Sequence, residues 1–64
     1  MKCSELIRIL RVSGWYAVSQ KGLHIKLKHA YHSYFIIVPN HGSDEIGKGL
    51  EKKILKQAGI VNEN

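Results

Sequence analysis

Residues 20–29 read QKGLHIKLKH, and this stretch decides what kind of fold the chain can form. Gly22 marks a tight turn, after which apolar and polar residues alternate with a period of two, as in a strand with one buried face. The apolar residues of the alternation are Ile25 and Leu27. The polar residues, expected about 6.5–7 Å apart on the open face, are His24, Lys26 and Lys28. The stretch therefore predicts an electropositive sheet face that contains one histidine.

Two amphipathic helices are expected, one near each end of the chain. Apolar residues recur at helical spacing over residues 4–14, with Ser4 as the expected N-cap and Gly14 as the stop signal. A second apolar stripe runs through residues 50–60 and ends at Gly59, which is typical of a helix C-terminus. Each helix would bury one side and leave its charged side to solvent.

Three strands separate the two helices, and short connections join them. Residues 15–20 and 34–39 are strand-prone, and the continuous apolar run of the latter predicts the most buried strand. Short connections favour an antiparallel meander. We therefore predict an α+β fold in the order α-β-β-β-α: a three-stranded antiparallel sheet with two helices on one face. Residues 1–64 should form one domain, in which residues 61–64 are a frayed tail.

Composition excludes several classes of protein and favours a polyanionic partner. The 64 residues contain no apolar run long enough for a membrane span or a signal peptide. Cys3 is the single cysteine, so no intrachain disulfide can form, and we expect a cytoplasmic protein. Ten Lys and Arg against five Asp and Glu give a net charge of +5, which favours RNA, DNA or an acidic protein as partner.

The order and spacing of four short motifs resemble the HicA-type mRNA interferase toxins over residues 4–60. These motifs are the helix followed by Gly14-Trp15, the turn Gly22-x-His24, the segment Val38-Pro39-x-His41, and the closing run from Lys48 to Ile60. The resemblance implies a fold like the double-stranded-RNA-binding domain and a ribonuclease that cuts mRNA without a metal. It also implies a HicB-type antitoxin that covers the active site, and it assigns the catalytic histidine to His24.

The chain departs from the family pattern at two positions. Many members carry Gly-Ser-His where this chain has Gly22-Leu23-His24, so a hydroxyl is missing beside the histidine. Gly47 stands where many members have proline before the last helix. The first departure concerns substrate contact, and the second concerns the stiffness of a loop.

The residues of the opening stretch can support RNA cleavage without a metal. The 2′-hydroxyl of RNA can attack the adjacent phosphate, so the protein must move protons and stabilise negative charge. His24 is the candidate for proton transfer because imidazole exchanges protons near neutral pH. The candidates for RNA binding are Lys21, Gly22, Lys26 and Lys28. We expect no metal or other cofactor, because the acids are scattered and the four histidines lack cysteine companions at zinc spacing.

Other interpretations remain open at this point. The basic face could serve a noncatalytic RNA-binding module, or it could only dock an acidic protein. His41 could assist catalysis or cap its loop, and we favour the loop. His29 and His32 flank a turn, where a solvated position is commonest. Tyr31 and Tyr34 could stack on a base, whereas Trp15, Tyr16 and Phe35 are more often core or half-buried sheet residues.

Overall fold

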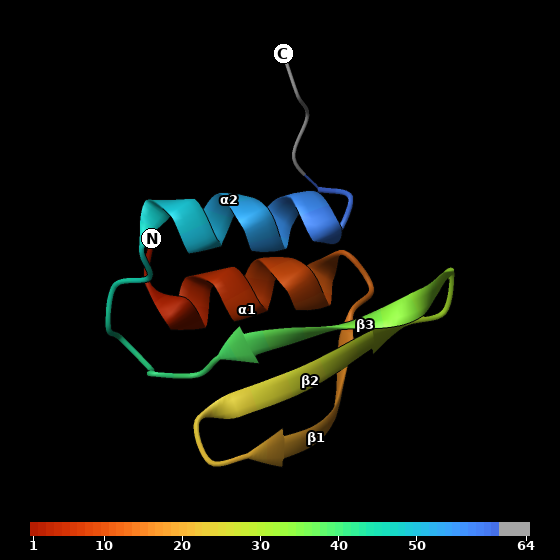
Figure 1. The fold of residues 1–64 in the computed structure, drawn as a ribbon, viewed down its shortest axis with the longest axis horizontal. Coiled ribbons are helices and arrows are strands. Elements are labelled where there is room, and N and C mark those ends of the chain that lie inside the picture. The colour runs from red at the N-terminus through yellow and green to blue at the C-terminus, as the bar shows by residue number, and fades with distance from the viewer. Residues whose placement is uncertain (61–64) are drawn as a thin grey trace.

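The chain runs from a helix through three strands to a second helix in the computed structural model, which describes residues 1–60. The predicted order α-β-β-β-α is confirmed (Figure 1). The predicted frayed tail, residues 61–64, lies outside the described residues. No helix among residues 1–60 is both long and apolar enough to cross a membrane. The elements are α1 (Cys3–Val12), β1 (Tyr16–Lys21), β2 (His24–His29), β3 (His32–Pro39) and α2 (Lys48–Gln57).

The three strands form an antiparallel sheet in the order β1-β2-β3, with β2 in the centre. His24, the first residue of β2, pairs with Lys21 of β1 and with Pro39 of β3. The register shifts once in each pair, between Ala17 and Ser19 in β1 and near the end of β2. Directly paired residues project from the same face of a sheet. The register therefore determines which side chains of neighbouring strands meet.

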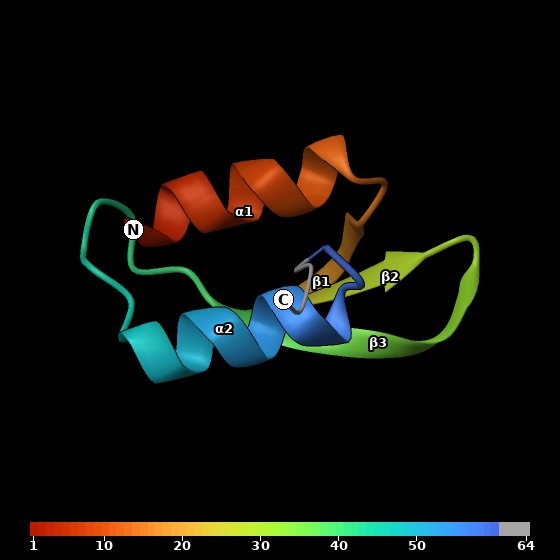
Figure 2. The same ribbon diagram turned by 90° about the horizontal axis from the view of Figure 1, so that it is seen from above.

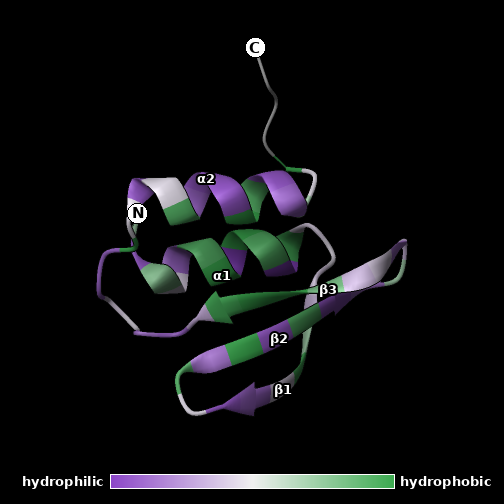
Figure 3. Ribbon diagram, viewed as in Figure 1, coloured by the Kyte–Doolittle hydropathy of each residue, from purple (hydrophilic) through white to green (hydrophobic). Residues whose placement is uncertain are grey.

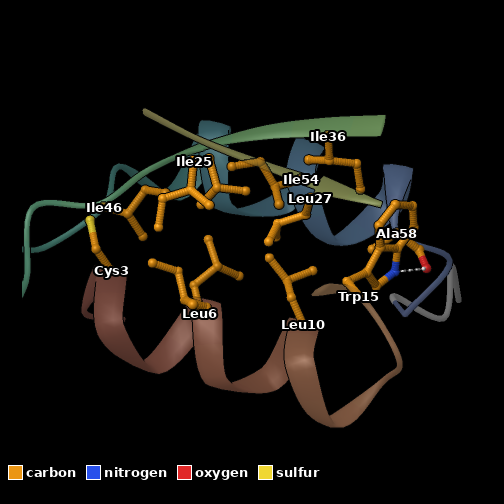
Figure 4. Packing of buried hydrophobic residues seen from close by; sticks show 12 residues of the cluster. Cys3, Leu6, Leu10, Trp15, Ile25, Leu27, Ile36, Ile46, Ile54 and Ala58 are labelled. Atoms are coloured by element: carbon orange, nitrogen blue, oxygen red, sulfur yellow. Dashed lines mark hydrogen bonds between the residues drawn. The ribbon is translucent and has the colours of Figure 1, made fainter. Parts of the chain in front are cut away.

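Both helices lie over one face of the sheet, as predicted, and the core fills the space between the layers (Figures 1 and 2). Hydrophobic and hydrophilic residues alternate along β2 (Figure 3), and Ile25 and Leu27 are buried under the helices. Ile36 and Val38 of β3 pair with Leu27 and Ile25 and are buried on the same side. The buried residues are Cys3, Leu6, Ile7, Leu10, Trp15, Ile25, Leu27, Ile36, Val38, Ile46, Ile54 and Ala58 (Figure 4).

Trp15 closes one end of this core, and two histidines pack against its ring. Its side chain is 1% exposed, and its indole N–H donates a hydrogen bond to the Ala58 carbonyl at 3.4 Å. The His32 ring stacks on it with centroids 5.1 Å apart, and His29 meets its edge at 5.1 Å. The expectation that both histidines are solvated is therefore wrong. Each is half-buried and packs against the tryptophan.

β3 is not the most buried strand, contrary to the prediction from its continuous apolar run. It lies at an edge of the sheet and its residues alternate: Ile36 and Val38 are buried, whereas Phe35 is 51% and Ile37 is 47% exposed. Helices cover only one face, so every second side chain of the run faces outward. An apolar run predicts two-sided burial only where both faces are covered.

The N-terminus of α1 is held by the loop after β3 rather than by a Ser4 cap. The helix begins at Cys3 with Lys2 as N-cap, and Glu5 accepts a hydrogen bond from the Lys2 backbone N–H at 2.9 Å. The carbonyl groups of Asp44 and Gly42 accept hydrogen bonds from the next two backbone N–H groups, at 2.9 and 3.0 Å. These bonds satisfy donors that a helix leaves free at its first turn. A long-range contact therefore replaces the predicted local cap.

Acidic side chains gather at this same end of the molecule. The Met1 α-amino group lies 2.9 Å from the Glu45 carboxylate and 3.6 Å from that of Glu51. The hydrogen bond from the Met1 α-amino group to Glu45 lowers the pKa of the Glu45 carboxyl. Glu45 and Glu51 thus contact the α-amino group, and Glu5 accepts the Lys2 backbone hydrogen bond, all beside the N-terminus of α1.

Gly14→Ala is expected to destabilise the fold more than Gly22→Ala. Both glycines have positive φ, +102° and +59°, which an L-residue adopts at a cost of about 1–3 kcal/mol. A Cβ at Gly14 would also lie 2.5 Å from Nε2 of His29, whereas one at Gly22 would have no neighbour within 4 Å. We expect a loss of about 3 kcal/mol in the free energy of unfolding for Gly14→Ala and about 1 kcal/mol for Gly22→Ala. Urea denaturation followed by circular dichroism measures both, and equal losses would contradict the steric argument.

Candidate active site

The hairpin between β1 and β2 aims His24 at the open face of the sheet. Its turn consists of Gly22 and Leu23, and Gly22 has φ +59°, the sign that a type II′ turn requires at its first central position. The Gln20 side-chain amide donates to the Gly22 carbonyl at 3.0 Å. The backbone N–H of Asn40, just after β3, donates to the Leu23 carbonyl at 2.6 Å. The turn is thus tied to both neighbouring strands.

A hollow of about 450 Å³ lies on the sheet face opposite the helices and includes His24. Its walls come from all three strands, and their contact follows from the register: Lys21 pairs with His24, Ser19 with Lys26, and Lys26 with Ile37. No Asp or Glu among residues 1–60 lines it. The hollow therefore combines one imidazole with two ammonium groups. The lining residues are Ser19, Lys21, His24, Lys26 and Ile37.

Two comparisons with known proteins bear on this arrangement. A family model described as the HicA toxin of bacterial toxin-antitoxin matches residues 3–60. The chain belongs to the HicA toxin family. It is also 38% identical over 60 residues to a protein of Pseudomonas fluorescens (strain Pf0-1) named "Probable mRNA interferase HicA", and the match covers 94% of this chain and 97% of that protein.

The structure of this HicA-family chain brings three of the predicted site residues together and places two others outside the hollow. Lys21, His24 and Lys26 line it. Gly22 forms the adjoining turn, where its positive φ explains the glycine. Lys28 is exposed but pairs with Tyr16 near the other end of β2, so it does not contribute to the hollow.

The other histidines of the HicA-family chain lie apart from His24. His41 borders a separate recess with Cys3, Pro39 and Glu45, at the loop that holds the start of α1. His29 Nε2 forms a hydrogen bond with the Ser13 carbonyl oxygen at 2.9 Å, and His32 stacks on Trp15. Among residues 1–60, no three His, Cys, Asp or Glu side chains gather closely enough to hold a metal ion together. His24 is thus the histidine in contact with the lysine-lined hollow.

Ser19 and Ile37 line the hollow but were not predicted from the sequence. Ser19 could have been found, because counting back from a two-residue turn places it opposite Lys26. Ile37 required the pairing of β2 with β3, which the sequence does not specify. Ser19 lines the same hollow as His24, although the residue beside that histidine in sequence is Leu23.

Proposed function

We propose that this protein is the toxin of a type II toxin–antitoxin system and cuts mRNA without a metal ion. The observation that carries the proposal is the hollow that His24 lines together with Lys21 and Lys26, where no carboxylate of residues 1–60 contributes to the walls. Such a site can bind a phosphodiester and exchange a proton with it. The name of the Pseudomonas fluorescens relative supports mRNA as the substrate class.

The reaction needs only groups of the RNA and of the hollow. The RNA 2′-oxygen attacks the adjacent phosphorus, the bond to the 5′-oxygen breaks, and the products are a 2′,3′-cyclic phosphate and a 5′-hydroxyl. His24 takes the proton from the 2′-hydroxyl or gives one to the leaving 5′-oxygen. Lys21 and Lys26 hold the phosphate and stabilise the charge that develops on its oxygens. Since the nucleophile belongs to the substrate, no metal-bound water is required.

A HicB-type antitoxin is the proposed inhibitor, and the cytoplasm, where mRNA is translated, is the proposed location. An unrestrained mRNase harms the cell that makes it, so a tight inhibitor must accompany it. The open sheet face carries Lys21 and Lys26 around His24, and an acidic partner would be steered toward these charges. Covering this face would block the site without unfolding the toxin.

The purified protein is expected to cut a long single-stranded RNA in the presence of EDTA. The products should carry 2′,3′-cyclic phosphate ends, and an equimolar amount of the HicB-type protein encoded by the adjacent gene should stop the reaction. RNA end-group analysis after gel separation gives the readout. RNA binding without cleavage would instead favour the noncatalytic RNA-binding module, in which Leu23 replaces the usual serine beside the histidine.

A further inference from the structure

An exposed apolar strip on β3 adjoins the hollow around His24. Phe35 and Ile37 are about half exposed because they occupy the outward positions of an edge strand. Ile37 lines the hollow and also a second recess of about 270 Å³, which lies between β3 and α2 and which Phe35, Leu50 and Lys53 border. The two recesses thus share a wall. An extended ligand in the hollow would reach Phe35 directly.

A lysine of the hollow already contacts the aromatic ring of this strip. Nζ of Lys26 lies 4.2 Å from the centroid of the Phe35 ring, over its face. Lys26 therefore lines the hollow and also contacts the ring. Tyr34, the neighbouring aromatic residue, is turned to the helix side, where its hydroxyl donates to the Gln57 carbonyl. Of these two adjacent aromatics, Phe35 is the one presented on the open face.

We propose that Phe35, supported by Ile37, is a base-stacking subsite beside the phosphate that His24 and the lysines hold. The proposal rests on the function proposed above. A nucleotide of single-stranded RNA carries an anionic phosphate and a flat base with an aromatic face, and the two recesses place lysine ammonium groups beside the aromatic face of Phe35. Stacking a base on Phe35 would release Lys26 from the ring toward the phosphate. Phe35 would then position the RNA chain, and catalysis would remain with His24.

Binding measurements on a variant that cuts RNA much more slowly test this subsite. In a His24→Gln background, Phe35→Ala should weaken binding of an unstructured 12-nucleotide RNA about tenfold, the usual loss when one stacked base is released. The slope of log affinity against log salt should stay unchanged, because no charge is removed. An abasic ribose–phosphate oligomer of the same length should bind both proteins equally. Val12→Ala also truncates an exposed apolar side chain, 83% exposed at the end of α1 and outside both recesses, so it is the control and should leave affinity unchanged.

A second substitution at position 35 distinguishes the loss of base stacking from unfolding of the protein. Phe35→Trp enlarges the stacking surface, so it should bind the 12-nucleotide RNA at least as tightly as the parent, and RNA should quench the introduced indole. The proposal is overturned if Phe35→Ala binds the 12-nucleotide RNA with normal affinity. It is also overturned if the substitution weakens binding of the abasic oligomer as much as it weakens binding of the RNA. Normal RNA binding combined with weakened binding of the HicB-type protein would assign the strip to the antitoxin. Failure of the proposed function is recognised separately, as absence of RNA cleavage by the unmodified protein.

Discussion

His24→Gln is expected to lower the rate of RNA cleavage by about 10²–10⁴-fold, the usual contribution of a general acid or base. Glutamine keeps the size and hydrogen-bonding capacity of the side chain but cannot exchange a proton near neutral pH. RNA affinity should remain close to that of the unmodified protein, because Lys21 and Lys26 still line the hollow. Cleavage of a labelled RNA under single-turnover conditions, with binding measured in parallel, gives both quantities.

Two further variants make this result specific. His41→Gln changes an exposed histidine in a different recess and should leave both cleavage and binding unchanged. Lys26→Gln removes one charge from the hollow, so it should weaken binding and reduce the salt slope by about 0.7. If His24→Gln and His41→Gln reduced cleavage equally, the assignment of proton transfer to His24 would fail.

Trp15→Ala is expected to destabilise the fold by about 3–5 kcal/mol, the usual cost of truncating a buried aromatic residue. The side chain is 1% exposed, donates a hydrogen bond to Ala58 and contacts His29 and His32. A domain of 64 residues has a total stability of only about 3–10 kcal/mol, so a large share of the variant should be unfolded at 25 °C. Because Trp15 is the single tryptophan, far-ultraviolet circular dichroism is the appropriate probe.

Val12→Ala provides the control for this variant. Its side chain is 83% exposed at the end of α1, so truncation should change the free energy of unfolding by less than about 0.5 kcal/mol. A Trp15→Ala protein as stable as Val12→Ala would show that the tryptophan does not hold the core together. Addition of the HicB-type protein should raise the folded fraction of Trp15→Ala, because a partner that binds only the folded state stabilises it.

Local patterns sufficed to predict the elements and the face on which His24 lies, whereas the catalytic role of His24 was inferred from the family resemblance. The alternation after Gly22 placed Ile25 and Leu27 in the core, and it placed His24 and Lys26 on the open face. These positions depend on interactions between residues close in the chain: the φ that a turn requires, and the period of two in a strand. The helix boundaries were predicted to within about three residues for the same reason.

Contacts between distant residues decided the remaining features. The cap of α1 comes from a loop about 40 residues away in sequence, and the positions of His29 and His32 depend on Trp15. Phe35 and Ile37 read as core residues because their run is apolar, yet the structure leaves them half exposed beside the hollow. Hydropathy says which residues favour burial, but only the packing of layers determines which faces are covered. Tertiary packing therefore determines that one face of the sheet is covered, and on the uncovered face the Phe35 ring lies beside Lys26 of the hollow.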